Sequence, residues 1–152
     1  MDGRCTCGAV RYRLAAAPLF THACHCTWCQ RESGSAFALN AVIEADRLEV
    51  AGAVEEIVIP SASGKGQTVA RCPACKVALY SYYAGAGRKV AFVRIGTLAH
   101  PATCPPDIHI FTETKLPWLV LPEGARVVPE YYRRSAEWPA DSLARWAALN
   151  SG

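Results

Sequence analysis

Seven of the eight cysteines in this chain fall into three tight clusters. Cysteines one or two residues apart can direct their thiolates at one metal ion, because a tight turn brings both sulfurs within bonding distance of one tetrahedral centre. Seven sulfurs suit two ions unequally: a closed four-thiolate zinc is structural, whereas a zinc with three protein ligands keeps one position free for chemistry. The pattern therefore predicts two zinc ions per chain. The clustered residues are Cys5, Cys7, Cys24, Cys26, Cys29, Cys72 and Cys75.

Disulfides, buried free thiols and iron–sulfur clusters are the alternatives to zinc. Disulfides need an oxidising compartment, and residues 1–14 carry three arginines but no apolar stretch of a secretory signal. A bond between Cys5 and Cys7 would be strained, because a disulfide requires a particular Cβ separation and dihedral angle. The spacings do not reproduce those of ferredoxins. Zinc is the favoured interpretation.

The spacing also suggests how the cysteines divide between the two ions. Cys24, Cys26 and Cys29 are close enough in sequence to bind one ion by themselves. The other four would then join the N-terminus to the middle of the chain, a long-range clip whose binding energy contributes to folding. Three basic neighbours either offset the negative charge of that site or are ordinary solvated charges. They are Arg4, Arg71 and Lys76.

Length and composition are consistent with one domain over residues 1–152. Ten prolines and eleven glycines divide the chain into short segments. A formal charge of +3 is too small to argue for a nucleic-acid partner. No apolar stretch reaches the roughly 18 residues of a membrane helix, so we expect a cytoplasmic protein without a membrane partner.

The sequence predicts that most of the elements that position the cysteines are short strands, so the expected fold class is mainly β. Residues 9–14 alternate apolar and basic side chains, as in a half-buried strand. Only the tail, residues 140–150, has helical spacing, and residues 27–33 form at most a turn of helix ended by Gly34. The other expected strands are residues 37–43, 55–59, 67–70, 77–83, 89–95, 108–111 and 118–121.

Longer motifs around the cysteines resemble a known family. Residues 3–12 (GRCTCGAVRY), 24–37 (CHCTWCQRESGSAF) and 71–75 (RCPAC) look like the glutathione-dependent formaldehyde-activating enzyme family, which includes centromere protein V. Residues 106–111 and 115–118 are similar to a later motif of that family. The resemblance covers residues 3–121 in the expected order and leaves residues 122–152 as a C-terminal extension.

The resemblance implies a fold of several small coiled β-sheets organised around zinc sites, with a short C-terminal helix. Carried over by position, Cys5, Cys7, Cys72 and Cys75 match the structural zinc of the family. The catalytic zinc matches Cys24, Cys26 and Cys29. The implied activity condenses glutathione with formaldehyde, which is a carbon–sulfur lyase reaction run in reverse. Lys76 stands where the family usually has glycine, so it must take a left-handed turn at some cost.

Several other residues allow two interpretations each. Cys104 is either a buried inert thiol or a fourth ligand that closes the three-cysteine site. His25, between two ligands, points away from the metal, and His109 is a structural histidine in preference to an acid or base. Arg31 and Arg94 either bind a substrate carboxylate or form ordinary surface contacts. Trp28 either forms part of the wall of a pocket or simply packs against other side chains. Residues 82–83 and 131–134 hold tyrosines and arginines too sparse to indicate nucleic acid.

Two functions of different classes follow. The first is a zinc-dependent carbon–sulfur lyase-type enzyme that joins or cleaves a small thiol, such as glutathione, and an aldehyde. The second is a non-catalytic zinc module that binds a protein or nucleic acid. An open metal position facing a cleft beside Cys24, Cys26 and Cys29 favours the enzyme, whereas a closed site favours the module.

Overall fold

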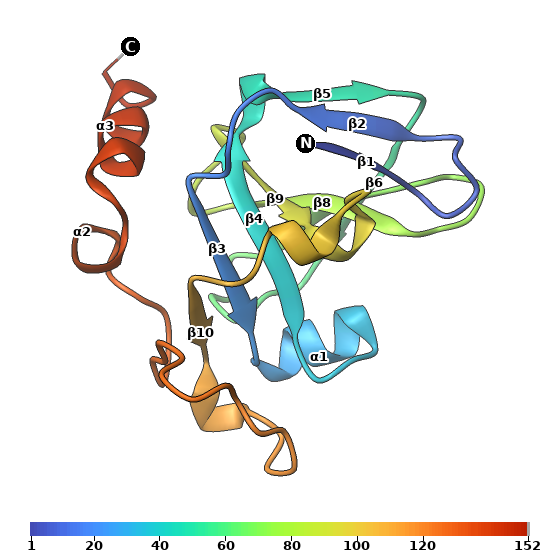
Figure 1. The fold of residues 1–152 in the computed structure, drawn as a ribbon. Helices are drawn as coiled ribbons and strands as arrows, with labels where there is room; N and C mark the ends of the chain where they lie inside the picture. The colour runs from blue at the N-terminus through green and yellow to red at the C-terminus, as the bar shows by residue number, and fades with distance from the viewer. Residues whose placement is uncertain (152) are drawn as a thin grey trace.

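The strands of the computed structural model, which describes residues 1–151, form two sheets (Figure 1). A three-stranded antiparallel sheet contains β1 (Asp2–Arg4), β2 (Arg11–Leu14) and β5 (Leu48–Ala51). The seven-stranded sheet has the order β10-β3-β4-β9-β8-β7-β6. Its strands are β3 (Phe20–Cys24), β4 (Ala38–Glu44), β6 (Glu55–Ile59), β7 (Gln67–Arg71), β8 (Ala78–Tyr83), β9 (Val90–Arg94) and β10 (Ile108–Ile110). The prediction of a mainly β fold with more than one sheet is confirmed.

The central strands of the larger sheet are buried on both faces. Successive side chains of a strand point to opposite faces, so Ala41 and Ile43 of β4 join one apolar cluster and Val42 joins another. The first cluster lies against the three-stranded sheet and includes Tyr12 and Leu14. The second lies under the C-terminal segment and includes all of Cys24, Cys26 and Cys29.

In the part of the chain that the structure describes, three α-helices and four short 3₁₀ turns complete the fold. α1 (Thr27–Ser33) starts directly after Cys26, and its C-cap Gly34 has φ 63°, so the predicted helical turn is present. α2 (Arg134–Glu137) and α3 (Ala140–Ala148) follow at the C-terminus. The 3₁₀ turns are η1 (Ala45–Arg47), η2 (Ile95–Thr97), η3 (Pro101–Thr103) and η4 (Thr112–Thr114).

The strand predicted over residues 118–121 is wrong. Prolines flank this segment, and the Leu119 N–H donates to the Leu116 carbonyl in a turn. The Lys115 ammonium donates to the carbonyls of Leu116 and Leu119, so these backbone groups are satisfied locally and pair with no strand among residues 1–151.

The sequence patterns missed β1, β3, β5 and α2. β3 escaped notice because all five of its residues are buried, and a strand covered on both faces lacks the alternation that identifies a half-buried one. β1, β5 and α2 are only three or four residues long, too short for a periodic signal.

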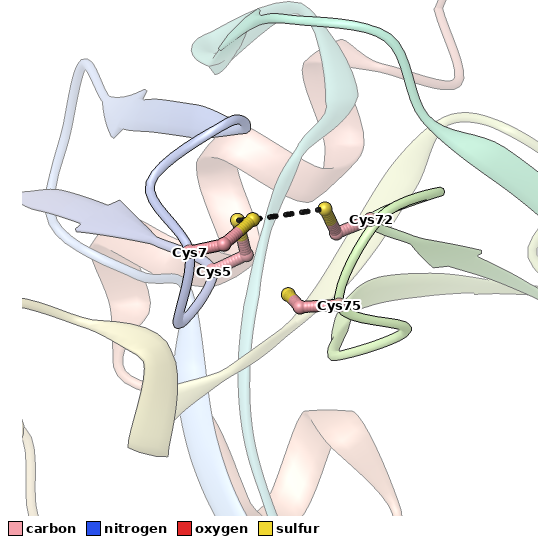
Figure 2. Close-up of side chains that lie close together, drawn as sticks. All are labelled: Cys5, Cys7, Cys72 and Cys75. Atoms are coloured by element: carbon pink, nitrogen blue, oxygen red, sulfur yellow. Dashed lines mark hydrogen bonds between the residues drawn. The ribbon is translucent and has the colours of Figure 1, made fainter.

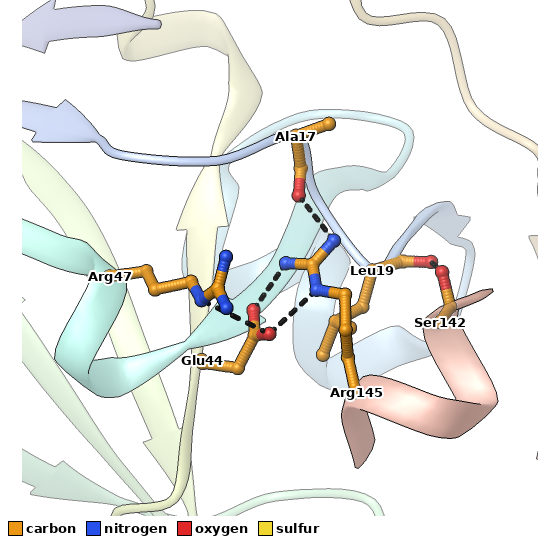
Figure 3. A network of polar contacts seen from close by, with 6 residues as sticks. All are labelled: Ala17, Leu19, Glu44, Arg47, Ser142 and Arg145. Carbon is orange, nitrogen blue, oxygen red and sulfur yellow. Dashed lines mark hydrogen bonds and ion pairs between the residues drawn. The ribbon is translucent and has the colours of Figure 1, made fainter. Parts of the chain in front are cut away.

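The C-terminal helices are held to the sheet by polar contacts (Figure 3). The guanidinium of Arg145 donates to both carboxylate oxygens of Glu44 at the end of β4, with Nε 2.7 Å from Oε1. It also donates to the Ala17 carbonyl at 3.0 Å, and the Ser142 hydroxyl donates to the Leu19 carbonyl at 2.5 Å. α3 therefore packs on the body of the protein through side-chain hydrogen bonds of Ser142 and Arg145.

Candidate metal centres and the adjoining cavity

Four cysteine sulfurs from two loops converge on one point (Figure 2). The Sγ atoms of Cys5, Cys7, Cys72 and Cys75 all lie within 4.8 Å of one another. Cys7 Sγ is 3.5 Å from Cys5 Sγ and 3.7 Å from Cys72 Sγ. Zn–S bonds of about 2.3 Å in a tetrahedron place the sulfurs about 3.8 Å apart, so this arrangement fits a four-thiolate zinc.

The two loops that carry these sulfurs have matching backbones. The Cys5 N–H donates to the Val10 carbonyl and the Cys72 N–H to the Val77 carbonyl, each at 3.0 Å. Each loop then passes through a left-handed residue, Gly8 with φ 79° and Lys76 with φ 62°. Lys76 therefore takes the left-handed turn expected from the sequence, at a cost of about 1–2 kcal/mol.

The other cluster is local and forms where β3 meets α1. Cys24 ends β3, Cys26 is the N-cap of α1, and Cys29 lies in its first turn. The Cys29 N–H donates to Cys26 Sγ at 3.3 Å, so one thiol both caps the helix and faces the cluster. All three are buried, and their sulfurs lie within 4.8 Å of one another.

No fourth Cys, His, Asp or Glu joins this group among residues 1–151. Cys104, the rival ligand, lies in the other apolar cluster, which also holds Tyr12 and Leu14. Burial raises the pKa of the Cys104 thiol, as expected for an inert structural cysteine.

Hydrogen bonding already favours the thiolate form of some sulfurs in each cluster. Contacts with Cys24 and Cys29 lower the pKa of Cys26 to about 3, and the contact with Cys26 raises the pKa of Cys24. Backbone N–H groups of Cys7 and Val77 lower the pKa of Cys75 to about 6. The Val10 N–H, which donates to Cys5 Sγ, is the largest cause of a lowered pKa at Cys5 as well. Some sulfurs of each cluster are thus stabilised as thiolates by their surroundings, whereas the full set of thiolates requires a cation among them.

A cavity of about 470 Å³ opens beside the three-cysteine cluster. Its buried part includes Cys24, Cys26, Cys29 and His22. Its exposed part is formed by Trp28, the loop between β6 and β7, and the C-terminal segment. The other residues that line it are Ser61, Ala62, Ser63, Lys65, Gln67, Tyr83, Gly85, Ala86, Phe92, Ile110, Phe111, Tyr131 and Arg134.

Comparisons with known proteins identify the family of this chain. The model of a family described as glutathione-dependent formaldehyde-activating enzyme matches residues 1–114. The chain belongs to this family. A curated protein of Halomonas elongata, provisionally named a glutathione-dependent formaldehyde-activating enzyme, is 30% identical over 97% of this chain and 94% of its own.

A solved structure shares the fold. The crystal structure of a Rhodobacter sphaeroides protein is similar with a TM-score of 0.50 and 20% identity, over 65% of this chain and 88% of that chain. The family match ends at residue 114, so most of the segment that brings Tyr131 and Arg134 to the cavity lies beyond it. Within residues 1–151, no helix has both the length and the apolar character needed to cross a bilayer.

The structure assigns contacts to the residues whose roles were open. His25 Nε2 is 2.9 Å from His109 Nδ1, and both rings are buried, so the two histidines form a buried hydrogen-bonded pair. Neither lines the cavity, whereas Trp28 does and is 41% exposed. Arg31 packs over the Trp28 ring, and the buried Arg94 donates to Asn40 Oδ1 at 2.7 Å. Neither arginine lines the cavity.

Two of the three basic neighbours of the four-cysteine site form ion pairs, and Arg4 forms none within residues 1–151. Arg71 pairs with Glu32 of α1, and Lys76 pairs with Glu55 at 2.8 Å. These contacts favour ordinary ion pairing over direct compensation of the thiolates. The Arg71–Glu32 pair also links β7, next to the first cluster, with the helix of the second.

Sequence reasoning missed four residues of the cavity wall: His22, Lys65, Gln67 and Arg134. His22 lies in the strand without alternation, and Lys65 lies in a loop identified only by composition. Arg134 belongs to the extension that the family resemblance does not cover. No local signal in the sequence marks these residues, because only the tertiary fold brings them to one cavity.

Proposed function

We propose that this chain is a zinc-dependent carbon–sulfur lyase-type enzyme that joins or cleaves a small, glutathione-like thiol and an aldehyde. The observation that carries the proposal is the three-cysteine cluster, which lies in the wall of a cavity and has no fourth protein ligand among residues 1–151. Family membership supports the same class of reaction.

The proposed roles divide between the two clusters. Cys5, Cys7, Cys72 and Cys75 would hold a structural zinc, and Cys24, Cys26 and Cys29 a catalytic one. The second ion would supply Lewis acidity and a low thiol pKa at neutral pH. The three cysteines fix the position of the reacting sulfur at the buried end of the cavity, and Phe92 and Ile110 exclude water there.

The reaction balances without an oxidant or reductant. The substrate sulfur forms a bond to the carbonyl carbon, the π electrons of the carbonyl move to its oxygen, and that oxygen takes the proton released by the thiol. Cleavage is the reverse. The eight free cysteines suit the cytoplasm, where thiols stay reduced.

We also propose that residues 1–152 act as one domain, with the core over residues 3–121 and the extension over 122–152. Tyr132 and Trp138 of the extension lie in the same apolar cluster as the three cysteines. The alternative of a non-catalytic binding module is less well supported, because it predicted a closed site or no cavity.

The test is exchange spectroscopy on zinc-loaded protein with glutathione and ¹³C-formaldehyde. We expect the protein to accelerate interconversion of free formaldehyde and S-hydroxymethylglutathione, and Cys26→Ser to abolish the acceleration. Cys104→Ala is the matched control and should keep it, since Cys104 lies outside both clusters. Unchanged exchange with zinc-loaded wild-type protein would overturn the proposal.

A further inference from the structure

The charged groups of the cavity are separated from its sulfurs. The three cysteines are buried, whereas Lys65 and Arg134 are exposed. Among residues 1–151, these two cations are the only Lys, Arg, Asp or Glu side chains that line the cavity. Lys65 comes from the loop between β6 and β7, and Arg134 is the first residue of α2.

Both cations are available to a ligand. Neither forms an ion pair with an acidic residue among residues 1–151. Arg134 is held in place by Trp146, because its guanidinium carbon lies 4.2 Å from the centre of that ring. A pre-positioned guanidinium with free donors is suited to bind a carboxylate through two hydrogen bonds.

A third polar group in the same wall also lacks a partner. Gln67 of β7 is only 3% exposed, and its Oε1 accepts no hydrogen bond from residues 1–151. A buried amide oxygen without a donor costs free energy, so it marks a place for a ligand N–H group.

We infer that Lys65 and Arg134 determine specificity by binding the carboxylate end of the substrate thiol, while Gln67 accepts a hydrogen bond from its amide. The ligand class is an acidic peptide-like thiol, with its sulfur at the buried end and its carboxylate at the exposed end. The inference rests on the proposed function, since the sulfur must lie at the three-cysteine cluster.

Charge balance supports this assignment. Three thiolates around a divalent ion carry net negative charge, and an incoming thiolate adds to it. A substrate that also carries carboxylates would be repelled unless cations offset the charge. Lys65 and Arg134 supply that compensation at the end of the cavity away from the cysteines. The C-terminal extension, which lies beyond the family match, thereby becomes part of the substrate site.

The test compares two ligands that differ only in their carboxylates, glutathione and glutathione diethyl ester. Binding to full-length protein loaded with cobalt(II) is followed by the sulfur-to-cobalt charge-transfer band. Wild-type protein should bind glutathione about tenfold more tightly than the ester, as charge-assisted hydrogen bonds imply. Lys65→Gln and Arg134→Gln should each reduce this preference about threefold, and the double variant should abolish it.

Arg133→Gln is the matched control. Arg133 is the exposed neighbour of Arg134 and does not line the cavity, so the preference should not change. Raising the ionic strength should weaken the wild-type preference and leave ester binding unaffected, because exposed charges are screened. Gln67→Leu should weaken binding of both ligands to a similar extent.

The outcomes separate the two proposals. If both ligands bind with an equal affinity that Lys65→Gln and Arg134→Gln leave unchanged, the assignment of these cations is wrong while thiol binding stands. If neither ligand changes the charge-transfer band, the proposed function and the inference fall together.

Discussion

At the scale of single residues, the metal clusters depend on a few special backbone positions. Lys76 has φ 62° and follows the last ligand of the four-cysteine site. Its N–H donates to the Cys72 carbonyl at 2.9 Å, which closes the turn. A non-glycine residue in this conformation is strained. The same turn directs Cys75 at the other sulfurs, so the strain is the cost of bringing this ligand to the site.

Replacing Lys76 tests that interpretation. Lys76→Gly should be more stable than Lys76→Ala by about 1 kcal/mol, because glycine adopts the left-handed region without strain. Both variants lose the ion pair with Glu55, so the difference between their free energies of unfolding reports the cost of the left-handed backbone alone. Urea unfolding of the zinc-loaded proteins measures it. At a position with ordinary helical φ the order would be reversed, and that result would contradict the strained turn.

At the scale of elements, alternation predicted the half-buried strand β2. Residues 9–14 contain β2, whose period of two follows from one covered face. Residues 55–59 contain β6, which was predicted from its β-branched composition and has four of its five residues exposed. β3 could not be found in this way because both of its faces are buried. Residues 118–121 resembled a strand in composition, but no neighbouring strand pairs with them within residues 1–151.

The attachment of the C-terminal helix to β4 gives a pH-dependent prediction. Burial alone would raise the pKa of Glu44, but hydrogen bonds from Arg145 and its charge outweigh burial and lower the pKa. A carboxylate with a lowered folded pKa stabilises the fold above its unfolded pKa and loses this contribution as the pH falls through the folded value. Glu44→Gln should therefore cost about 1–2 kcal/mol at neutral pH, and the cost should shrink on acidification.

Urea unfolding of wild type and Glu44→Gln over a pH series measures this difference. Loss of zinc in acid affects both proteins alike, so the difference between them reports on Glu44. Glu49→Gln provides a matched control on the exposed strand β5, where no ion pair is formed within residues 1–151. A cost for Glu44→Gln that stays constant with pH would contradict the assignment.

At the scale of the whole molecule, the two clusters have different positions in the fold. Cys5 and Cys7 lie between β1 and β2 of the small sheet, and Cys72 and Cys75 lie between β7 and β8 of the large one. This cluster joins the two sheets, whereas the three-cysteine cluster is contained in one strand–helix junction. The division of the cysteines could be predicted from spacing, because each ligand loop is local. The cavity wall could not be predicted, because it combines five stretches of the chain, within residues 22–29, 61–67, 83–92, 110–111 and 131–134.

Metal content should follow this difference. The purified protein is expected to carry up to two zinc ions per chain, and a chelator should remove the ion of the three-cysteine cluster first. One thiolate fewer and access from the cavity both weaken retention. Elemental analysis during chelation, with Cys104→Ala as control, measures both points. Protein that contains no zinc after gentle purification, with its thiols paired as disulfides, would rule out the metal assignment.

Substitution of one ligand in each cluster separates folding from chemistry. Cys72→Ser should cause global loss of structure, because its site joins the two sheets and metal-binding energy there is folding energy. Cys26→Ser should leave the fold largely intact while removing the second ion. Serine is a preferred N-cap residue. Its hydroxyl can accept the hydrogen bond from the Cys29 N–H, so α1 still begins at the same position.

Thermal melts followed by circular dichroism compare the two variants. Equal losses of thermal stability would show that the three-cysteine cluster is as structural as the other, and the proposed catalytic role would lose its main support.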